Sequence, residues 1–504
     1  MVQKMKIRSA SLILALALTA QVISCGTTQT DPNDTTPDSS TEPSQSTDTE
    51  SAELRDSLPK DLSFGGETIH ILYRGNSAIA DYDILGVENS GDIVFDAIHN
   101  RNASVEERLD IEFDFIAAPG SWSEANKYFT TTLMSGAEGI DLIWTSGNTL
   151  VANGHNTSFR DLNDSRYLDF DKPWWNYSAM REMSLDGKTM SFLYGNLMLC
   201  GLRQTGLMYF NKNMFTDLWG NPDDLYQTVL DGNWTLDKFN GYCKGVYTDL
   251  NGNGKADEDS DRFAYMLSSN DQENITHFEY ATDISTYKRD DSGVPVIDMS
   301  DDRSMTIALR FCEIFSKTNT DICFSTHTLS DSNIYDAFAE GRTLFLPERF
   351  YASTLPQLRN MKDEYGMIPY PKFDENQSEY INLIHNSGTT AGVPIAVSDE
   401  RFDMVTAALE AMASEQYNSV MPSFYELALK TKYSRDEISS KVIDLVYDCS
   451  TKDLIGEYAA VTGYFYVLMA QCIYKDQPYA SAYASKISSA NAELKSLYEN
   501  VFGK

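Results

Sequence analysis

The sequence is short of positive charge, of histidine and of recognisable catalytic motifs, and each shortage excludes a class of protein. Its 504 residues include 40 Lys and Arg against 74 Asp and Glu, a formal net charge of −34. Clustered Lys and Arg bind phosphate backbones and anionic lipid surfaces, so we expect no nucleic-acid partner. The six histidines form no HExxH pair, and the sequence contains no GxSxG, P-loop or GxGxxG motif.

The abundance of carboxylates does not point to an enzyme either. A glycosidase uses two carboxylates, and 74 acidic residues would supply such a pair by chance. We therefore expect that the chain is not an enzyme, with a surface glycosidase as the weakest alternative. Hydrophobic residues make up 42% of the chain, which is enough for the cores of two or three domains.

The N-terminus carries an export signal. Lys4, Lys6 and Arg8 precede a short apolar run that is too short to span a bilayer comfortably. The run ends in VISCG, and small and aliphatic residues before the single Cys25 resemble a bacterial lipobox. We expect residues 1–24 to be a lipoprotein signal peptide and Cys25 to be lipidated, which would anchor the protein outside the cytoplasm on the cell membrane. The alternative is an ordinary signal peptide with a chance cysteine.

A tether follows the lipobox. Residues 25–57 consist of Cys25 and a stretch rich in Ser, Thr, Pro and Asp with almost nothing to bury. Such a composition does not support a packed core, so we predict a disordered acidic spacer between the membrane and the folded part of the chain.

Cysteine is scarce after Cys25, and its spacing predicts no disulfide framework. Six more cysteines follow and none forms a CxxC pair: Cys200, Cys243, Cys312, Cys323, Cys449 and Cys472. We expect buried thiols. A single bridge between Cys312 and Cys323 stays open, because an exported protein meets an oxidising environment.

Folded sequence begins near Leu58 and mixes two periodicities. Val94, Ile98, Val105 and Leu109 recur at helical spacing, and the following LDIEFDF stretch alternates apolar and acidic residues as a strand does. Other short apolar stretches read as strands, and the sequence from about residue 401 is mostly helical: the strand candidates are 68–74, 140–146, 343–350 and 366–371. The class is therefore α/β with helical C-terminal additions.

The stretch DLNGNGKADED, residues 249–259, has the spacing of a calcium loop. Thr235 and the Trp234–Phe239 pair predict a capped helix before the loop, and Arg262–Leu267 reads as a strand after it. Alternate side chains and one backbone carbonyl supply the oxygens that calcium prefers. The predicted ligands are Asp249, Asn251, Asn253, Lys255 through its carbonyl, Asp257 and Glu258. A helix–loop–strand lacks the second helix of a sensor, so we expect a structural staple; an uncoordinated acidic turn is the alternative.

Several stretches occur in an order that resembles a known family. They are KPWW at 172–175, LMYFNKNMF at 207–215, GNWTLDKF at 232–239, the acidic loop, YGMIPYPKFDE at 365–375, AGVPIAVS at 391–398 and LALKTKYSRDE at 427–437. This series resembles the family 1 extracellular solute-binding proteins of bacterial ABC transporters, and within them the carbohydrate-associated lipoproteins. In relatives that bind acidic oligosaccharides, a calcium loop of this kind lies outside the ligand site.

The resemblance implies a two-lobed, periplasmic-binding-protein-like fold of the class II type. It predicts one lobe from residues 58–168 and about 337–392, and the other from about 169–336 and 393–504. It also implies a monomer that captures an oligosaccharide or other sugar between the lobes and delivers it to the permease subunits of an ABC transporter. A surface glycan-binding lipoprotein without a transport role, or a peptide-binding protein, is the alternative.

A sugar cleft combines flat aromatic faces with planar polar groups. The candidates lie near the ends of expected strands or in loops, and many of the aromatic residues are equally compatible with a core position. They are Trp144, Trp174, Trp175, Arg203, Tyr209, Arg349, Phe350, Tyr351, His385 and Asn386.

Overall fold

The computed structural model describes residues 54–75, 80–154, 156–268, 272–325, 333–424 and 437–503. The predicted signal peptide, Cys25 and most of the predicted tether lie outside these residues, as does most of the LALKTKYSRDE stretch. Among the described helices, none combines the length and the apolar character needed to cross a membrane. The contacts reported below lie within one unit, Glu53–Lys504.

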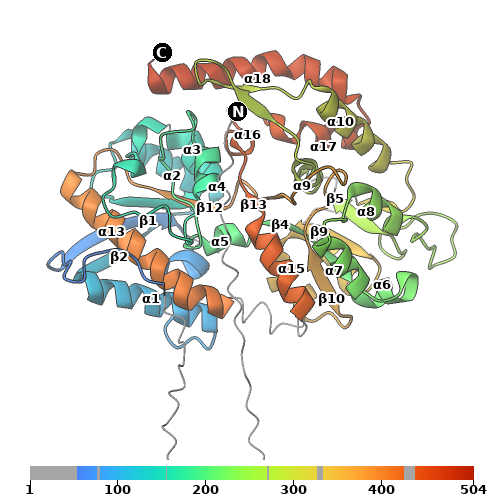
Figure 1. The fold of residues 1–504 in the computed structure, drawn as a ribbon, viewed down its shortest axis with the longest axis horizontal. Coiled ribbons are helices and arrows are strands. Elements are labelled where there is room, and N and C mark those ends of the chain that lie inside the picture. The colour runs from blue at the N-terminus through green and yellow to red at the C-terminus, as the bar shows by residue number, and fades with distance from the viewer. Residues whose placement is uncertain are drawn as a thin grey trace, which may run out of the picture. The chain divides into compact units, whose positions relative to one another are not determined.

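The first sheet has the strand order β12-β3-β1-β2 (Figure 1). Strands β1 (Glu67–Arg74), β2 (Ile111–Ala118) and β3 (Leu142–Ser146) run parallel, and β12 (Thr389–Gly392) joins β3 antiparallel. Helix α1 (Ile93–Leu109) connects β1 to β2, which confirms the βαβ unit predicted from the two periodicities.

Helix α1 forms where its sequence predicts. Asp92 caps its start by accepting a hydrogen bond from the Val94 amide at 2.9 Å, and Asp110 ends it in the left-handed conformation. Val94, Ile98, Val105 and Leu109 are fully buried, and burial of each such side chain contributes about 1.5–3 kcal/mol.

The second sheet is antiparallel, with the strand order β10-β4-β9. Its strands are β4 (Gly206–Asn211), β9 (Phe345–Arg349) and β10 (Tyr365–Ile368). Helices α6 (Lys212–Trp219) and α15 (Glu437–Asp448) pack against this sheet. The strands that were predicted at 343–350 and 366–371 therefore exist.

The pairing of these strands corrects the predicted lobe boundaries. The range 337–392 was assigned to the lobe of β1, but β9 and β10 within it pair with β4, and β12 alone joins the first sheet. Helix α13 (Asp399–Glu415), assigned to the other lobe, packs against α1 beside the first sheet (Figure 1). An apolar run predicts a strand but not the strand with which it pairs, because local hydrophobic periodicity does not depend on residues far away in the sequence.

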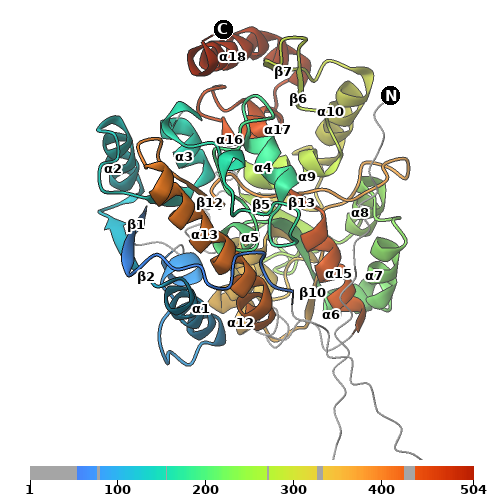
Figure 2. The ribbon, with the colours of Figure 1, turned by 60° about the vertical axis from the view of Figure 1, so that its left-hand side comes forward.

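The C-terminal part is helical, as predicted. Helices α16 (Leu454–Glu457), α17 (Leu468–Lys475) and α18 (Tyr479–Phe502) follow one another. Figure 2 shows α18 next to strands β6 (Tyr287–Arg289) and β7 (Pro295–Ile297). The side chain of Asn491 on α18 accepts a hydrogen bond from the Ile297 amide at 2.8 Å and donates one to the Ile297 carbonyl at 3.1 Å.

The remaining elements connect and cover these parts. They are α2 (Trp122–Met134), α3 (Gly147–Gly154), α4 (Tyr177–Met183), α5 (Leu199–Leu202), α7 (Asp223–Leu230), α8 (Leu236–Cys243), β5 (Tyr265–Ser268), α9 (Glu273–Ala281), α10 (Asp302–Ile314), β8 (Ile322–Ser325), α11 (Asn333–Ala339), α12 (Pro356–Arg359), β11 (Asn382–Leu383) and β13 (Ser450–Thr451), with short turns such as η1 (Ala80–Ile84) and η5 (Phe350–Thr354).

The six cysteines within the described part of the chain are all free thiols. The bridge between Cys312 and Cys323 that the sequence left open is therefore not formed. Cys200, Cys243 and Cys472 are buried, as expected, and the other three are half-buried.

Candidate functional site

Two connections between the sheets lie side by side. Residues 203–205 lead from α5 to β4, and residues 384–388 lead from β11 to β12. Thr205 forms an antiparallel bridge with Ile384, and the His385 amide donates a hydrogen bond to the Gln204 carbonyl at 3.0 Å. These paired connections are the crossing segments of a two-lobed fold.

The end of β9 joins the same place. The Phe350 amide donates to the Thr205 carbonyl at 2.9 Å, and the Tyr351 amide donates to the Arg203 carbonyl at 2.8 Å. We call residues 203–205, 348–351 and 384–388 the crossing region. It gathers six of the predicted ligand residues: Arg203, Arg349, Phe350, Tyr351, His385 and Asn386.

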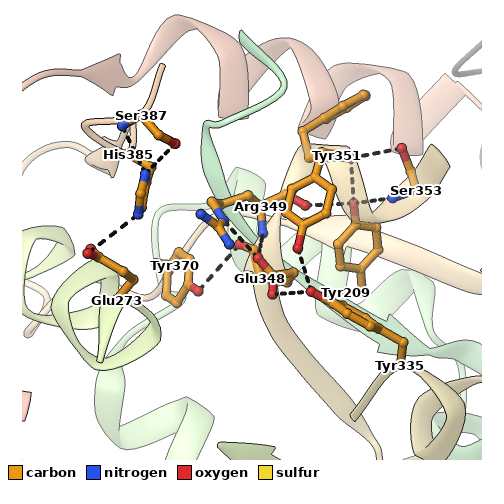
Figure 3. A network of polar contacts seen from close by, with 11 residues as sticks. Tyr209, Glu273, Tyr335, Glu348, Arg349, Tyr351, Ser353, Tyr370, His385 and Ser387 are labelled. Carbon is orange, nitrogen blue, oxygen red and sulfur yellow. Dashed lines mark hydrogen bonds and ion pairs between the residues drawn. The ribbon is translucent and has the colours of Figure 1, made fainter. Parts of the chain in front are cut away.

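A buried ion pair organises one side of the crossing region (Figure 3). The Arg349 Nε donates to Glu348 Oε1 at 2.9 Å, and both side chains are nearly buried. Tyr335 donates to Glu348 Oε2 at 2.9 Å, and its hydroxyl lies 2.5 Å from that of Tyr351. Burial, followed by the Glu348 charge, raises the pKa of Tyr335. The pair and the two hydroxyls present connected polar groups beside the crossing segments.

Tyr209 supports this arrangement from within the core. The side chain is fully buried on β4, and its hydroxyl donates to the carbonyls of Arg349 at 3.1 Å and Phe350 at 2.9 Å. The same oxygen accepts a hydrogen bond from the Ser353 amide at 3.0 Å. Tyr209 therefore fixes the turn after β9 on which Tyr351 stands.

A second polar group forms around His385. Its Nε2 lies 3.4 Å from Glu273 Oε1 and its Nδ1 lies 2.7 Å from the Ser387 hydroxyl (Figure 3). Tyr466 donates to the same Glu273 carboxylate. Burial alone would raise the pKa of Glu273, but the neighbouring imidazole and hydroxyl lower it to about 2. The Glu273 side chain is therefore a buried carboxylate that faces the His385 imidazole of the crossing region.

His277 lies next to this pair. Its ring stacks on Tyr370 with centroids 5.5 Å apart and lies 6.4 Å from the His385 ring. Burial first, and then the charges of His385 and Arg349, lower its pKa to about 3. Within the described ranges, neither ring nitrogen of His277 has a hydrogen-bond partner. The low pKa keeps this imidazole neutral near pH 7.

The predicted tryptophans lie in the core. Trp144 and Trp174 are fully buried and Trp175 is 5% exposed. Trp144 Nε1 donates to Asp83 at 3.3 Å, and Trp175 Nε1 donates to Glu410 at 2.8 Å. These indoles contact protein groups and are not among the residues gathered at the crossing region.

Asn386 is nearly buried and holds the second crossing segment in place. Its side-chain amide donates to the Gly456 carbonyl at 3.0 Å, and its carbonyl accepts from the Asn148 amide at 3.0 Å. This residue therefore links the start of α3 to α16.

Among the residues of the network that were not predicted are four charged or titratable ones: Glu273, His277, Tyr335 and Glu348. They come from α9, α11 and β9, which are far apart in sequence. Glu348 alone left a local signal, because a Glu-Arg pair ends the apolar strand TLFLPERF. The other three lacked such a signal, since buried histidines and acids occur on helices without a motif.

The acidic loop is held in a set of side-chain turns. The Asp249 carboxylate accepts from the amides of Gly252 at 2.7 Å and Gly254 at 2.7 Å, and Asn253 Oδ1 accepts from the Lys255 amide at 2.7 Å. Asn251 Nδ2 donates to Asp257 Oδ2 at 3.2 Å, so the two side chains meet across the loop. The helix α8 before the loop and the strand β5 after it were predicted correctly.

Asp261 closes the loop and was missed from the sequence. It is fully buried, and its carboxylate accepts from the amides of Leu250 and Asp257, both at 3.0 Å. Across the described ranges, no group of three or more His, Cys, Asp or Glu side chains is positioned to hold a metal ion. The predicted ligand set contains three such carboxylates, Asp249, Asp257 and Glu258, and they do not form a group of this kind; two amide side chains and one backbone carbonyl complete the set.

A hollow of about 720 Å³ lies elsewhere, where the described chain begins. Leu58, Arg166, Phe170 and Tyr177 are among the residues that line it. None of the predicted ligand residues belongs to it, so we do not identify it with the sugar site.

Comparisons with known proteins rest on structure. No protein-family model matches the chain, and no curated protein matches it in sequence. The galacto-N-biose-/lacto-N-biose I-binding protein of the ABC transporter from Bifidobacterium longum, in complex with lacto-N-biose, matches with a TM-score of 0.53 and 13% identity over 86% of this chain and 99% of that chain.

Two further solved structures agree. UspC of M. tuberculosis matches with a TM-score of 0.54 and 12% identity over 84% of this chain and all of that chain. The maltose/maltodextrin-binding domain MalE of Bdellovibrio bacteriovorus, bound to maltotriose, matches with a TM-score of 0.50 and 13% identity over 86% of this chain and all of that chain. The chain therefore has the two-lobed α/β fold of maltose-binding-protein-like periplasmic binding proteins, as the sequence predicted.

Proposed function

We propose that this chain is the solute-binding component of an ABC-type importer and that it captures an oligosaccharide at the crossing region. The observation that carries the proposal is the fold, which is shared with structures that hold lacto-N-biose and maltotriose. The crossing region adds a guanidinium, an imidazole and tyrosine hydroxyls, which suit the hydroxyl groups of a sugar. The role is binding without catalysis.

The position of these groups explains how capture could be coupled to closure. Arg349 is the last residue of β9 in the second sheet and Tyr351 follows that strand, whereas His385 lies on a segment that leads into the first sheet. A ligand shifts a conformational equilibrium only through contacts that differ between the two states. A sugar held by groups on both sides of the hinge favours the closed form, which would then dock on the permease subunits.

A thermal-shift screen tests this function. The purified full chain is heated with neutral and charged oligosaccharides, and with short peptides as the comparison class. A ligand at 100 times its dissociation constant adds about 2.7 kcal/mol to the stability and raises the melting temperature. A shift with a sugar that is recovered intact supports the proposal. A shift with peptides alone, or release of new reducing ends from the sugar, contradicts it.

We also propose that Cys25 is lipidated and anchors the protein to the outer face of the cell membrane. Near the start of the described chain, Asp56 is held by two hydrogen bonds from Arg108, at 2.6 and 2.8 Å. A tether before this point therefore leads into a fixed attachment on the folded part. Mass spectrometry of the N-terminal peptide should find acyl chains on Cys25, and Cys25→Ser should release the protein from the membrane fraction. An unmodified Cys25 contradicts the proposal.

We propose in addition that the acidic loop holds one structural calcium ion. The predicted ligands would be Asp249, Asn251, Asn253, the Lys255 carbonyl, Asp257 and Glu258. The turns around Asp249 and the contact between Asn251 and Asp257 support this ligand set, because they gather oxygens of the hard type that calcium takes. The bound ion would clip the end of α8 to β5 and would take no part in sugar chemistry.

A further inference from the structure

Arg203 is a buried cation without an acidic partner. Its side chain is only 6% exposed and its guanidinium lies 3.8 Å from the centre of the Tyr82 ring. One nitrogen donates to the Thr354 hydroxyl at 2.9 Å, the guanidinium also contacts the Cys200 thiol, and the buried Nε has no hydrogen-bond partner among the described residues. Within the described part of the chain, no carboxylate forms an ion pair with this residue.

Other buried cations in the molecule are compensated. Arg349 pairs with Glu348 at 2.9 Å and Lys452 pairs with Glu457 at 2.6 Å. Arg101 is held by four hydrogen bonds to neighbouring oxygens, and the charge of Asp83 acts on it. Lys372 forms no ion pair within the described ranges, and its ammonium donates to a main-chain carbonyl at 2.8 Å. Arg203 differs from these four residues in keeping a buried Nε without a hydrogen bond, a feature that it shares with the half-buried Arg262.

The residues that follow Arg203 also carry buried polar side-chain atoms. The side-chain oxygens of Gln204 and Thr205 are buried without hydrogen-bond partners in the described part of the chain, and so are both ring nitrogens of His277. His277 lies directly against Gly206, since a Cβ there would come within 2.3 Å of its Nδ1. Buried polar atoms are almost always hydrogen-bonded in native proteins. Such atoms occur elsewhere in the described core, but residues 203–205 carry them at three consecutive positions, which favours a ligand site on this crossing segment.

We propose that Arg203 binds an anionic group of the captured saccharide, a carboxylate or a sulfate; this rests on the proposed function. A buried charge is costly unless an opposite charge compensates it, and sugar hydroxyls carry none. A guanidinium matches a carboxylate or sulfate through parallel hydrogen bonds, and the Tyr82 ring holds its plane in one orientation. Because Arg203 lies on a crossing segment, the anion is bound where the two lobes hinge.

The test compares saccharides that differ only in charge. Calorimetric titrations of the full chain use tri-galacturonate, its methyl ester, and neutral and sulfated oligosaccharides. The same set is titrated into Arg203→Gln and into a control variant, Arg310→Gln. Arg310 lies on α10, and its partly exposed guanidinium pairs with Asp237 on α8 and with Glu313. Melting temperatures of the unliganded proteins are measured in parallel.

We expect the wild type and the control to bind an acidic or sulfated saccharide at least tenfold more tightly than its neutral counterpart. Arg203→Gln should lose this preference while keeping the weak affinity for the neutral sugar, and its unliganded melting temperature should not fall. The two anionic arms show whether the group is a carboxylate or a sulfate.

Two results would overturn the inference while leaving the proposed function intact. One is equal affinity for charged and neutral sugars in the wild type. The other is a variant with unchanged preference and a melting temperature several degrees lower, which would make Arg203 a structural residue. Failure of every saccharide to bind would instead remove the proposed function.

Discussion

The acidic loop and the crossing region differ in how their residues reach one place. The loop gathers its groups within 13 residues of chain, from Asp249 to Asp261, and each turn is made by a side chain bonding to an amide two to five residues away. The crossing region joins residues as distant as Arg203, Arg349 and His385, and His385 in turn faces Glu273 on α9. Local chemistry therefore specifies the first, and the topology of the sheets specifies the second.

The largest expected effect tests the crossing region. Glu348→Ala leaves the Arg349 guanidinium buried without its carboxylate, and breaking a buried pair in this way costs about 3–5 kcal/mol. Urea unfolding measures the loss. The control is Glu340→Ala, which breaks the pair of Arg342 with an exposed carboxylate and should cost no more than about 1 kcal/mol. Equal effects of the two changes would show that the Glu348 pair does not organise the region.

The second effect belongs to the loop. Chelation of calcium should lower the free energy of unfolding by about 2.7 kcal/mol relative to calcium at 100 times its dissociation constant. Asp249→Ala should abolish this difference, whereas Asp291→Ala, at an exposed aspartate of another turn, should keep it. Unfolding curves with and without a chelator measure both. A wild-type protein that is insensitive to the chelator would make the loop an acidic turn without a metal.

The third effect is a pH dependence of the crossing region. Burial lowers the pKa of His277 from 6.5 to about 3. Between pH 6.5 and pH 3 the imidazole is therefore protonated in the unfolded chain but neutral in the folded chain. Stability should therefore fall as the pH falls from 6.5 towards 3, by about 1.4 kcal/mol per unit from this residue. Glu273, with its pKa lowered to about 2, adds a loss of the same sign below pH 4.5.

Replacing the imidazole isolates this contribution. His277→Gln should flatten the fall in the free energy of unfolding between pH 6.5 and 5 by about 2 kcal/mol relative to the wild type. His70→Gln, at a half-exposed histidine beside Asp114 on β1, is the matched control. A profile for His277→Gln that matches the wild type would mean that His277 is not held neutral by the fold.

The smallest expected effect concerns the Tyr209 hydroxyl, which holds the turn after β9. Tyr209→Phe removes the hydroxyl that serves two carbonyls and the Ser353 amide, at an expected cost of about 1–2 kcal/mol. Tyr128→Phe, at an exposed tyrosine on α2, should change the stability by less than about 0.5 kcal/mol. If Tyr209→Phe costs no more than this control, the hydroxyl does not hold the turn after β9.

The contrast between local contacts in the acidic loop and long-range contacts in the crossing region also explains what the sequence could predict. Helix α1, strand β2, the capped helix α8 and the α/β class follow from local spacing and capping, and the structure has them. The placement of β9 and β10 with β4 could not be read, because neighbouring strands in a sheet need not be neighbours in the chain. The lobe boundaries were therefore wrong even where the strands were right.

The aromatic residues show a second limit. Trp174 and Trp175 were predicted as candidates for the sugar cleft, but both are buried: Trp174 lies beside Tyr417, and Trp175 bonds to Glu410 on α13. The residue that buries an indole can be more than 200 positions away, and composition does not identify it. Arg203, Arg349 and His385 were chosen as polar partners, and the fold brings their segments together.

A calorimetric titration with the best oligosaccharide from the screen would show whether the sugar binds at the crossing region. It compares the wild type with Tyr351→Ala, which removes a half-buried ring from the crossing region, and with Trp219→Ala, which removes an exposed indole from α6. We expect Tyr351→Ala to weaken binding at least tenfold and Trp219→Ala to leave it unchanged. A sugar that binds Tyr351→Ala as tightly as the wild type would place the binding site outside the crossing region.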